Sequence, residues 1–251
     1  MIEVEGLSKR YGDVVAVDGV SFSVDRGEVV GFLGPNGAGK TTTMRMLTGF
    51  LPPSDGSASI AGHDIFEDSM GARRSVGYLP ESPPLYPEMR VRDYVDYVAA
   101  IKDLPRRSRK EAVDRALERC GLSEVRSRVI ATLSKGYRQR VGLAQAIVHD
   151  PPVLILDEPT VGLDPIQIGE IRALIAELAS GDAQHTVVLS SHILAEVSAI
   201  CRRIIMINQG RKTVDAPIEE LTGEGRSLDA LFARETTRDI AAAPAAPEAA
   251  E

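Results

Sequence analysis

The sequence predicts an α/β fold with a mixed, mostly parallel sheet, an antiparallel β subdomain and an inserted α-helical subdomain. Two unbroken apolar runs, VVGFL at 29–33 and VLILD at 153–157, are typical of strands buried on both faces of a parallel sheet. After residue 153 strands alternate with helical segments, which is the pattern of parallel strands joined by helices. Between the two halves, residues 82–150 carry apolar side chains at helical spacing instead.

The first part of the chain is expected to form strands followed by a helix. Residues 2–33 contain IEVEGL, SFSV and VVGFL, and the glycine-containing DRGE before VVGFL marks a turn. A helix is expected from about Lys40, in KTTTMRMLTGF. Two short strands follow, ASIAG at 58–62 and RSVGYLP at 74–80, and the second must end at Pro80.

Three helical segments make up the insert: VRDYVDYVAAIK, RKEAVDRALERCGL, which closes on Gly121, and KGYRQRVGLAQAIVHD, which ends before two prolines. We therefore expect one domain over residues 1–235, with a core of 1–81 and 151–222 and a helical subdomain of about 82–150. The last stretch, AAAPAAPEAAE at 241–251, offers nothing large to bury, and we expect an Ala/Pro-rich disordered tail over 236–251.

After the insert the predicted elements are VLILD, a helix at 166–178, TVVLS, a helix at 193–201 and RIIMIN.

Composition and charge narrow the functional classes. The chain has 251 residues, 43% hydrophobic and 26% charged, with a net charge of -7, which argues against nucleic acid as a partner. Its two cysteines, Cys120 and Cys201, stand outside any CxxC pattern and are expected to fill the core, as in a reducing compartment. No apolar run approaches the ~18 residues that span a bilayer. The N-terminus has no signal-peptide pattern, so a membrane role would require a partner chain.

The segment GPNGAGKTT fits the phosphate-loop pattern G-x-x-x-x-G-K-[ST], with a buried strand before it and a helix after it. Glycines let backbone N–H groups turn toward phosphate oxygens, and the helix N-terminus adds partial positive charge. Lys40 is expected to reach the β- and γ-phosphates, and Thr41 to bind Mg²⁺. The plain alternative is a glycine-rich turn without a ligand. The expected phosphate-binding residues are Gly34, Pro35, Asn36, Gly37, Ala38, Gly39, Lys40, Thr41 and Thr42.

Two apolar strands end in residues suited to hydrolysis. VLILDEPT delivers Asp157 and Glu158 to the C-terminal edge of the sheet, where Asp157 is expected to hold Mg²⁺ and Glu158 to orient an attacking water. VVLSSH brings His192 to the same edge, facing a γ-phosphate or serving only as a surface histidine. Tyr11, near the end of the first strand, is placed either to stack on a base or to pack.

A second possible phosphate cradle lies far downstream, in LSKGYRQR at 133–140. Ser134 and Gly136 stand where a helix begins, and a helix N-terminus attracts anions. The alternative is that Ser134 is simply the N-cap of an ordinary helix. One nucleotide needs one cradle, so the second requires an explanation.

In this order, the motifs resemble those of the nucleotide-binding subunit of an ATP-binding-cassette (ABC) transporter. The resemblance covers the chain up to about residue 235. It assigns GPNGAGKTT as Walker A, LSKGYRQR as the signature motif and VLILDEPT as Walker B. It also places Tyr11 in the A-loop, YLPE in the Q-loop, VGLD with Asp164 in the D-loop, and SSH as the switch histidine. The segment YLPESPPLYPEMRVRDYV resembles exporter-type subunits that work with separate membrane subunits, as in multidrug, gliding-motility and copper- or haem-related systems.

The resemblance implies a P-loop NTPase that binds ATP and Mg²⁺ and hydrolyses ATP to energise transmembrane transport. It further implies two copies arranged head to tail, so that the signature of one closes over the nucleotide held by the other. The expected partner is a polytopic membrane subunit, and the expected location is the cytoplasmic face of the cell membrane. Two alternatives remain: a soluble ABC-type ATPase acting on nucleic acid or ribosomes, and a regulatory ATP sensor with negligible hydrolysis.

Three residues depart from the family pattern. Glu81 replaces the glutamine of the Q-loop and adds negative charge near the phosphates. Lys135 replaces the first glycine of the signature and Tyr137 its glutamine, whereas Ser134 and Gly136 are retained.

Overall fold

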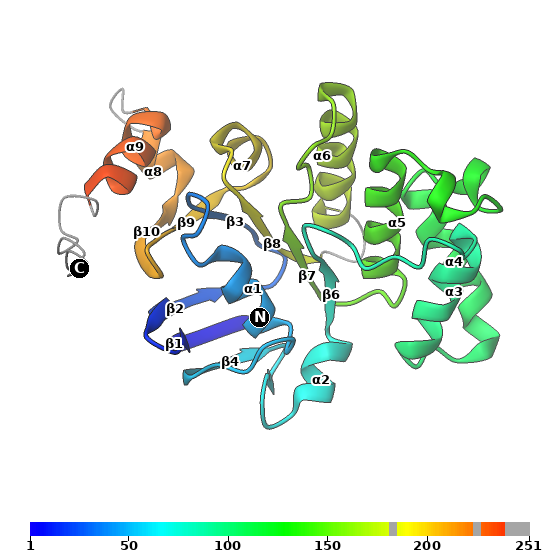
Figure 1. Ribbon diagram of the computed structural model, residues 1–251, viewed down its shortest axis with the longest axis horizontal. Coiled ribbons are helices and arrows are strands. Elements are labelled where there is room, and N and C mark those ends of the chain that lie inside the picture. The colour runs from blue at the N-terminus through cyan, green and yellow to red at the C-terminus, as the bar shows by residue number, and fades with distance from the viewer. Residues whose placement is uncertain (181–184, 223–226, 239–251) are drawn as a thin grey trace, which may run out of the picture.

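The computed structural model describes residues 1–180, 185–222 and 227–238, and this part of the chain forms two sheets with helices around them (Figure 1). The larger sheet has the strand order β10-β9-β3-β8-β7-β6. Pairing is parallel throughout it except between β9 and β10, so the predicted mixed, mostly parallel sheet is confirmed. Its strands are β3 (Val29–Leu33), β6 (Val76–Leu79), β7 (Val153–Asp157), β8 (Thr186–Ser191), β9 (Arg203–Asn208) and β10 (Arg211–Pro217).

The smaller sheet is antiparallel, with the order β2-β1-β4-β5, and corresponds to the predicted antiparallel subdomain. Its strands are β1 (Ile2–Tyr11), β2 (Val14–Val24), β4 (Asp55–Ile60) and β5 (His63–Asp64). Helix α1 (Lys40–Leu47) packs between the sheets, where its methionines join buried side chains from both.

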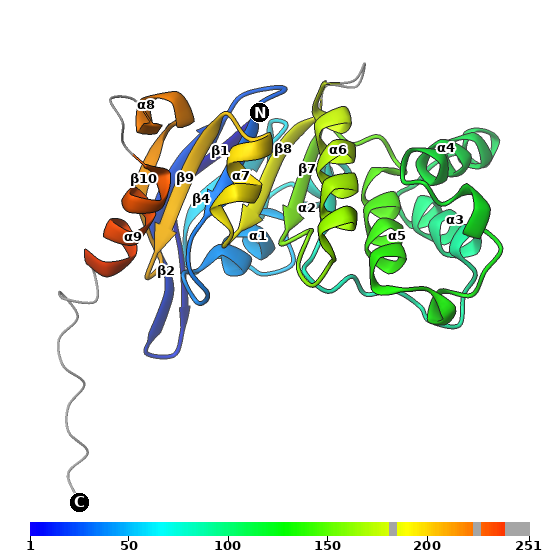
Figure 2. The same cartoon turned by 90° about the horizontal axis from the view of Figure 1, so that it is seen from above.

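The opposite face of the larger sheet is covered by α6 (Pro165–Ser180) and α7 (Leu194–Ile200), as Figures 1 and 2 show. Helices α3 (Val91–Ile101), α4 (Arg106–Arg119) and α5 (Lys135–Ile147) form the insert, at the end of the molecule beyond β6. They bury the apolar positions that their helical spacing predicts, including Val95, Leu117 and Leu143. None of the helices described here has both the length and the apolar character needed to cross a bilayer.

Several elements were not predicted from the sequence: α2 (Ser69–Arg74), β5, β10, α8 (Ile218–Thr222) and α9 (Leu228–Arg238). Strand β10 is formed because Gln209 and Gly210 both adopt positive φ, which closes a two-residue hairpin. Helix α9 continues to Arg238, three residues into the segment predicted as a tail. It is held by the packing of Leu231 and Phe232 on the core. The rest of the predicted tail, 239–251, lies outside the described residues.

Candidate functional site

The loop between β3 and α1 has the backbone geometry of an anion cradle. Gly37 and Gly39 adopt left-handed φ values of 80° and 104°, which side chains other than glycine rarely tolerate. A Cβ on Gly39 would lie 2.6 Å from the carbonyl oxygen of Ala16, so close approach of the backbone also requires glycine there. Helix α1 begins at Lys40 without a side-chain cap, which leaves its first N–H groups to a ligand.

Lys40 is buried beneath this loop. Its Nζ donates to the carbonyl oxygens of Gly34 at 2.8 Å and Pro35 at 3.1 Å. It also lies 3.4 Å from Glu158 Oε1, and both side chains are 6% exposed. The lysine charge is therefore fixed at the mouth of the loop, where the outer phosphates of a nucleotide would lie.

The predicted catalytic glutamate is held from two sides. Glu158 Oε2 accepts a hydrogen bond from His192 Nδ1 at 2.9 Å, while Oε1 faces Lys40. A carboxylate can only accept, so His192 carries a proton on Nδ1 in this arrangement. Glu158 itself adopts φ 49°, which is uncommon for a residue with a side chain and typical of functional sites.

Asp157 lies at the end of β7 and is completely buried. Burial raises the pKa of its carboxyl group, and the Ser190 and Thr41 hydroxyls partly offset that rise. Asp157 Oδ2 has no hydrogen-bond partner among the described residues. An unpartnered carboxylate oxygen beside a threonine hydroxyl fits Mg²⁺, which takes one or two protein oxygens and completes its shell with phosphates and water.

Gly37, Gly39, Lys40, Thr41, Glu158 and His192 line one cavity of about 620 Å³, and Asp157 is not among its lining residues. The cavity brings the phosphate loop together with the downstream residues expected to act in hydrolysis. Its lining residues are Ala16, Asn36, Gly37, Gly39, Lys40, Thr41, Thr42, Glu81, Glu158, Val161 and His192.

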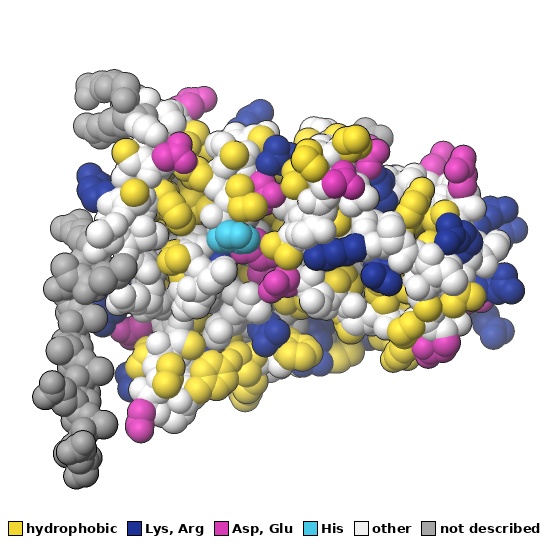
Figure 3. All heavy atoms as spheres, turned by 45° about the horizontal axis from the view of Figure 1, so that its top comes forward, with side chains coloured by type: hydrophobic (Ala, Val, Ile, Leu, Met, Phe, Trp, Pro, Cys, Tyr) yellow, Lys and Arg dark blue, Asp and Glu magenta, His cyan; other side chains and the backbone are white. Residues whose placement is uncertain are grey.

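Tyr11 is not among the lining residues. It is 49% exposed at the end of β1, with Lys9 Nζ 5.6 Å from its ring centroid. Figure 3 shows a histidine side chain exposed near the middle of one face, with acidic side chains beside it and Lys and Arg side chains toward the helical insert.

The signature segment lines a separate cavity of about 510 Å³, which contains Ser134, Gly136 and Asp164 but none of the residues of the phosphate loop. Ser134 Oγ accepts from the N–H of Tyr137 at 3.4 Å and thus caps α5. Asp164 caps α6 by accepting from the N–H of Gln167 at 2.9 Å. The structure therefore places the two predicted phosphate cradles in different parts of one chain.

Three residues at or beside the first cavity were given no role from the sequence. Ala16 and Val161 line it; Val161 is the first residue of the VGLD segment, in which only Asp164 was given a role. Ser190 hydrogen-bonds Asp157; it is the first residue of the SSH segment, in which only His192 was given a role.

Comparison with known proteins identifies the family. A family model described as ABC transporter matches residues 17–161. The chain is 38% identical over 226 residues to the bacitracin transport ATP-binding protein BcrA of Bacillus licheniformis, covering 90% of this chain and 72% of that protein. It is also 38% identical over 226 residues to the Nod factor export ATP-binding protein I of Ralstonia nicotianae, covering 88% of this chain and 68% of that protein.

Solved structures with the same fold belong to the same family. An ATP-binding subunit of an ABC transporter superposes with a TM-score of 0.84 at 31% identity, covering 93% of this chain and 98% of that chain. The dimeric ABC transporter cassette MJ0796 superposes with a TM-score of 0.79 at 26% identity, covering 87% of this chain and 99% of that chain. The P-loop NTPase fold and the ATPase activity predicted from the sequence are thereby confirmed. Because the family model spans more than half of the chain and two relatives exceed 30% identity over most of it, this chain belongs to the ABC transporter family, as an ATP-binding and ATP-hydrolysing subunit.

Proposed function

We propose that two copies of this chain hydrolyse Mg²⁺-ATP at their shared interface, and that this drives export through a separate polytopic membrane subunit at the cytoplasmic face of the membrane. One observation carries the proposal: a single chain holds two separate cavities suited to phosphate. In a head-to-tail pair, the cavity lined by the phosphate loop of one copy (the loop cavity) would face the cavity lined by Ser134 and Gly136 of the other (the signature cavity). A dimeric cassette with the same fold supports such a pairing.

In this proposal each residue of the nucleotide site has a distinct task. Lys40 and the N–H groups of the loop hold the β- and γ-phosphates. Thr41 and Asp157 hold Mg²⁺, which when bound neutralises the charge of the transferred phosphoryl group. Glu158 orients and polarises the attacking water, and His192 holds the Glu158 carboxylate through the 2.9 Å contact. Tyr11, exposed at the end of β1, would stack on the adenine.

The signature cavity would serve the nucleotide bound by the other copy. Ser134 and the free N–H groups at the start of α5 offer hydrogen bonds to its γ-phosphate, and the helix dipole adds to the attraction. Gly136 permits close approach, and Asp164 fixes the loop that leads into α6. Glu81 lines the first cavity and is placed to bind a water of the magnesium shell.

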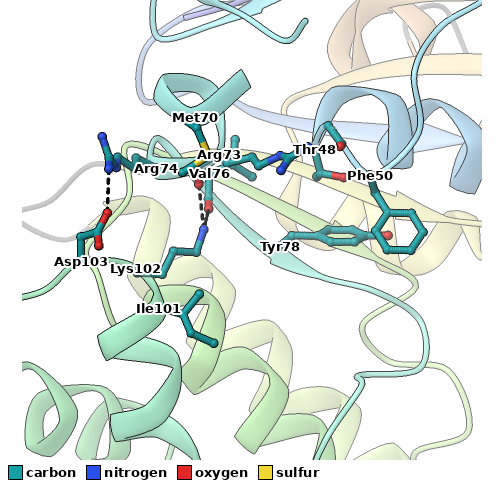
Figure 4. A pocket seen from close by; sticks show the side chains of 11 residues that line it. Thr48, Phe50, Met70, Arg73, Arg74, Val76, Tyr78, Ile101, Lys102 and Asp103 are labelled. Atoms are coloured by element: carbon teal, nitrogen blue, oxygen red, sulfur yellow. Dashed lines mark hydrogen bonds and ion pairs between the residues drawn. The ribbon is translucent and has the colours of Figure 1, made fainter. Parts of the chain in front are cut away.

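The membrane subunit would bind in a groove of about 500 Å³ between the nucleotide core and the helical insert (Figure 4). Phe50, Met70 and Ile101 present apolar side chains there and are 75%, 54% and 59% exposed. The groove takes its lining from α2 and β6 on one side and from the end of α3 on the other. A segment bound in this groove would contact both the nucleotide core and the helical insert. Any movement between the two would therefore displace it.

Basic groups in the same groove favour an acidic residue on the docking segment. Lys102 Nζ donates to the carbonyl oxygens of Arg73 at 2.7 Å and Val76 at 3.0 Å, as Figure 4 shows, and burial lowers its pKa to about 8. Arg74 is paired with Asp103, and Arg73 donates to the carbonyl oxygen of Gly49 at 2.8 Å. Within the described residues neither Arg73 nor Lys102 forms an ion pair, so their charges are available to an acidic residue. Leu85 and Tyr86, in the loop after Glu81, extend the apolar surface beside α3.

Transport of bacitracin is named for one relative and export of Nod factor for another, and the second name supports the export direction for this chain. The alternative of an ATPase acting on nucleic acid finds no such support, and the net charge of -7 is unsuited to a polyanion.

Glu158→Gln tests the proposal. The variant keeps the size of the side chain but cannot act as a base, and such positioned bases contribute ~100- to 10,000-fold to rate. Phosphate release should fall by at least that lower factor, while ATP binding and nucleotide-dependent dimerisation persist. Dimerisation is measured by light scattering with Mg²⁺-ATP. Undiminished phosphate release, or a variant that stays monomeric with nucleotide, would remove the basis of the proposed mechanism.

A further inference from the structure

Two adjacent serines end β8 and point to opposite faces of the sheet. Strand residues alternate between faces, so Ser190 shares its face with Val188 and Ser191 shares its face with Leu189. Val188 belongs to the buried cluster on the side of α1, and Leu189 to the cluster on the side of α6 and α7. Ser191 accordingly donates to Glu196 of α7 at 2.9 Å. Ser190 is directed toward the nucleotide site instead.

Ser190 is completely buried beside the residue expected to bind magnesium. In the parallel pairing of β7 and β8 it stands opposite Asp157. Its Oγ donates to Asp157 Oδ1 at 2.5 Å and accepts from the N–H of Glu158 at 3.1 Å. A hydroxyl has one proton to give and lone pairs to receive, so this one group satisfies both neighbours at once.

Each of these contacts fixes an atom that the reaction needs. With Oδ1 engaged by Ser190, the other carboxylate oxygen, Oδ2, has no hydrogen-bond partner among the described residues and is available to a metal ion. The bond to the N–H of Glu158 holds a residue at φ 49°, a conformation that side-chain-bearing residues adopt only when their surroundings impose it. An apolar residue at 190 would leave Asp157 Oδ1 without this donor. The N–H of Glu158 would keep only its bond to the carbonyl oxygen of residue 190, which measures 3.1 Å.

We propose that Ser190 is a positioning residue for ATP hydrolysis, which orients the Asp157 carboxylate toward Mg²⁺ and holds the Glu158 backbone so that its side chain faces Lys40 and His192. This inference rests on the proposed roles of Asp157 and Glu158. Ser190 lies outside the VLILDEPT segment that assigns those roles, and it acts through both carboxylates without touching the nucleotide.

The test is Ser190→Ala in the full chain, which removes one oxygen atom and nothing else. Partners that orient a metal ligand typically contribute ~10- to 100-fold to metal affinity or activity. We expect kcat to fall by at least about tenfold, and the Mn²⁺ affinity of the protein with a non-hydrolysable ATP analogue, measured by electron paramagnetic resonance, to fall by a similar factor. Nucleotide affinity measured in EDTA should be unchanged, because the phosphate loop is intact.

Thr186→Val is the matched control. Thr186 is a completely buried hydroxyl at the other end of the same strand, and its Oγ1 accepts from the N–H of Gly27 at 2.9 Å. Its loss should lower stability to a similar extent while leaving kcat and Mn²⁺ affinity at wild-type values.

If Ser190→Ala matches Thr186→Val in both kcat and Mn²⁺ affinity while Glu158→Gln is inactive, the positioning role is wrong and the proposed function stands. If Glu158→Gln turns over ATP normally, the proposed function itself fails. The two failures are therefore distinguishable in one set of assays.

Discussion

Substituting Gly136 by alanine should leave the fold of the signature segment intact but impair its proposed binding of the other copy's phosphate. Gly136 lies in the first turn of α5, and its φ is not in the left-handed region, so the backbone accepts alanine. The added Cβ would lie 2.6 Å from Gln167 Oε1 and 2.7 Å from its Cδ. These atoms are the end of a flexible side chain, which can swing away.

The expected magnitudes differ between stability and catalysis. Alanine gains up to about 1 kcal/mol over glycine inside a helix, and displacing the Gln167 amide offsets part of that gain. The free energy of unfolding should therefore stay within about 1 kcal/mol of wild type. In the proposed dimer, the methyl group and the displaced amide would keep the other copy's phosphate from the start of α5. Losing one hydrogen bond to a charged group costs about 1.5–3 kcal/mol, or roughly 10- to 150-fold in kcat/KM.

The assay pairs phosphate release at varied ATP with urea unfolding of the same preparation. Gly169→Ala is the control, since nothing lies within 4 Å of its added Cβ in α6. It should gain ~0.5–1 kcal/mol in stability with unchanged turnover. Wild-type kcat/KM in Gly136→Ala would refute the argument that a second nucleotide is bound at the start of α5.

Two further predictions concern buried titratable groups. Burial, with the charge of Lys102, lowers the pKa of His149 to about 3. Below pH 6.5, the ordinary pKa of histidine, the imidazole therefore binds a proton in the unfolded chain but stays neutral in the folded protein. The free energy of unfolding should thus fall as the pH drops below 6.5, by up to about 1.4 kcal/mol per pH unit. Urea unfolding at pH 7 and at pH 5 should show a smaller loss of stability in His149→Gln than in the wild type. Burial raises the pKa of the Cys120 and Cys201 thiols to about 12, so a disulfide-exchange reagent should titrate no thiol in the native protein and two after denaturation.

The sheet and the helical insert could be predicted because their signals are local. The apolar run VLILD is buried at every position, as its composition predicts for a strand with both faces covered. The three insert helices follow from their apolar spacing. Strand β10 could not be predicted in this way, because RKTVDAP is only partly buried and the turn before it uses Gln209 where asparagine would be the stronger signal.

The site was predictable where a motif fixes the spacing, and less so where the contact depends on folding. Gly37, Gly39 and Lys40 lie as their sequence pattern predicts, because glycine permits the turn and the helix begins directly after it. The Glu158–His192 contact joins residues 34 positions apart and depends on the parallel pairing of β7 and β8. The bond from Ser190 to Asp157 depends on the same register, which no short motif encodes.

The contacts of Lys40 suggest why binding and hydrolysis are linked in this site. Its ammonium group has three N–H donors, of which two serve the carbonyl oxygens of Gly34 and Pro35, so the third is available to Glu158. A γ-phosphate oxygen arriving at the loop must compete with the Glu158 carboxylate for that donor. Two anions this close repel by about 1–3 kcal/mol at 5 Å for effective dielectric constants of 80 to 20. Phosphate binding would therefore push the glutamate off the lysine, leaving His192 as its remaining contact and freeing an oxygen to accept a proton from water.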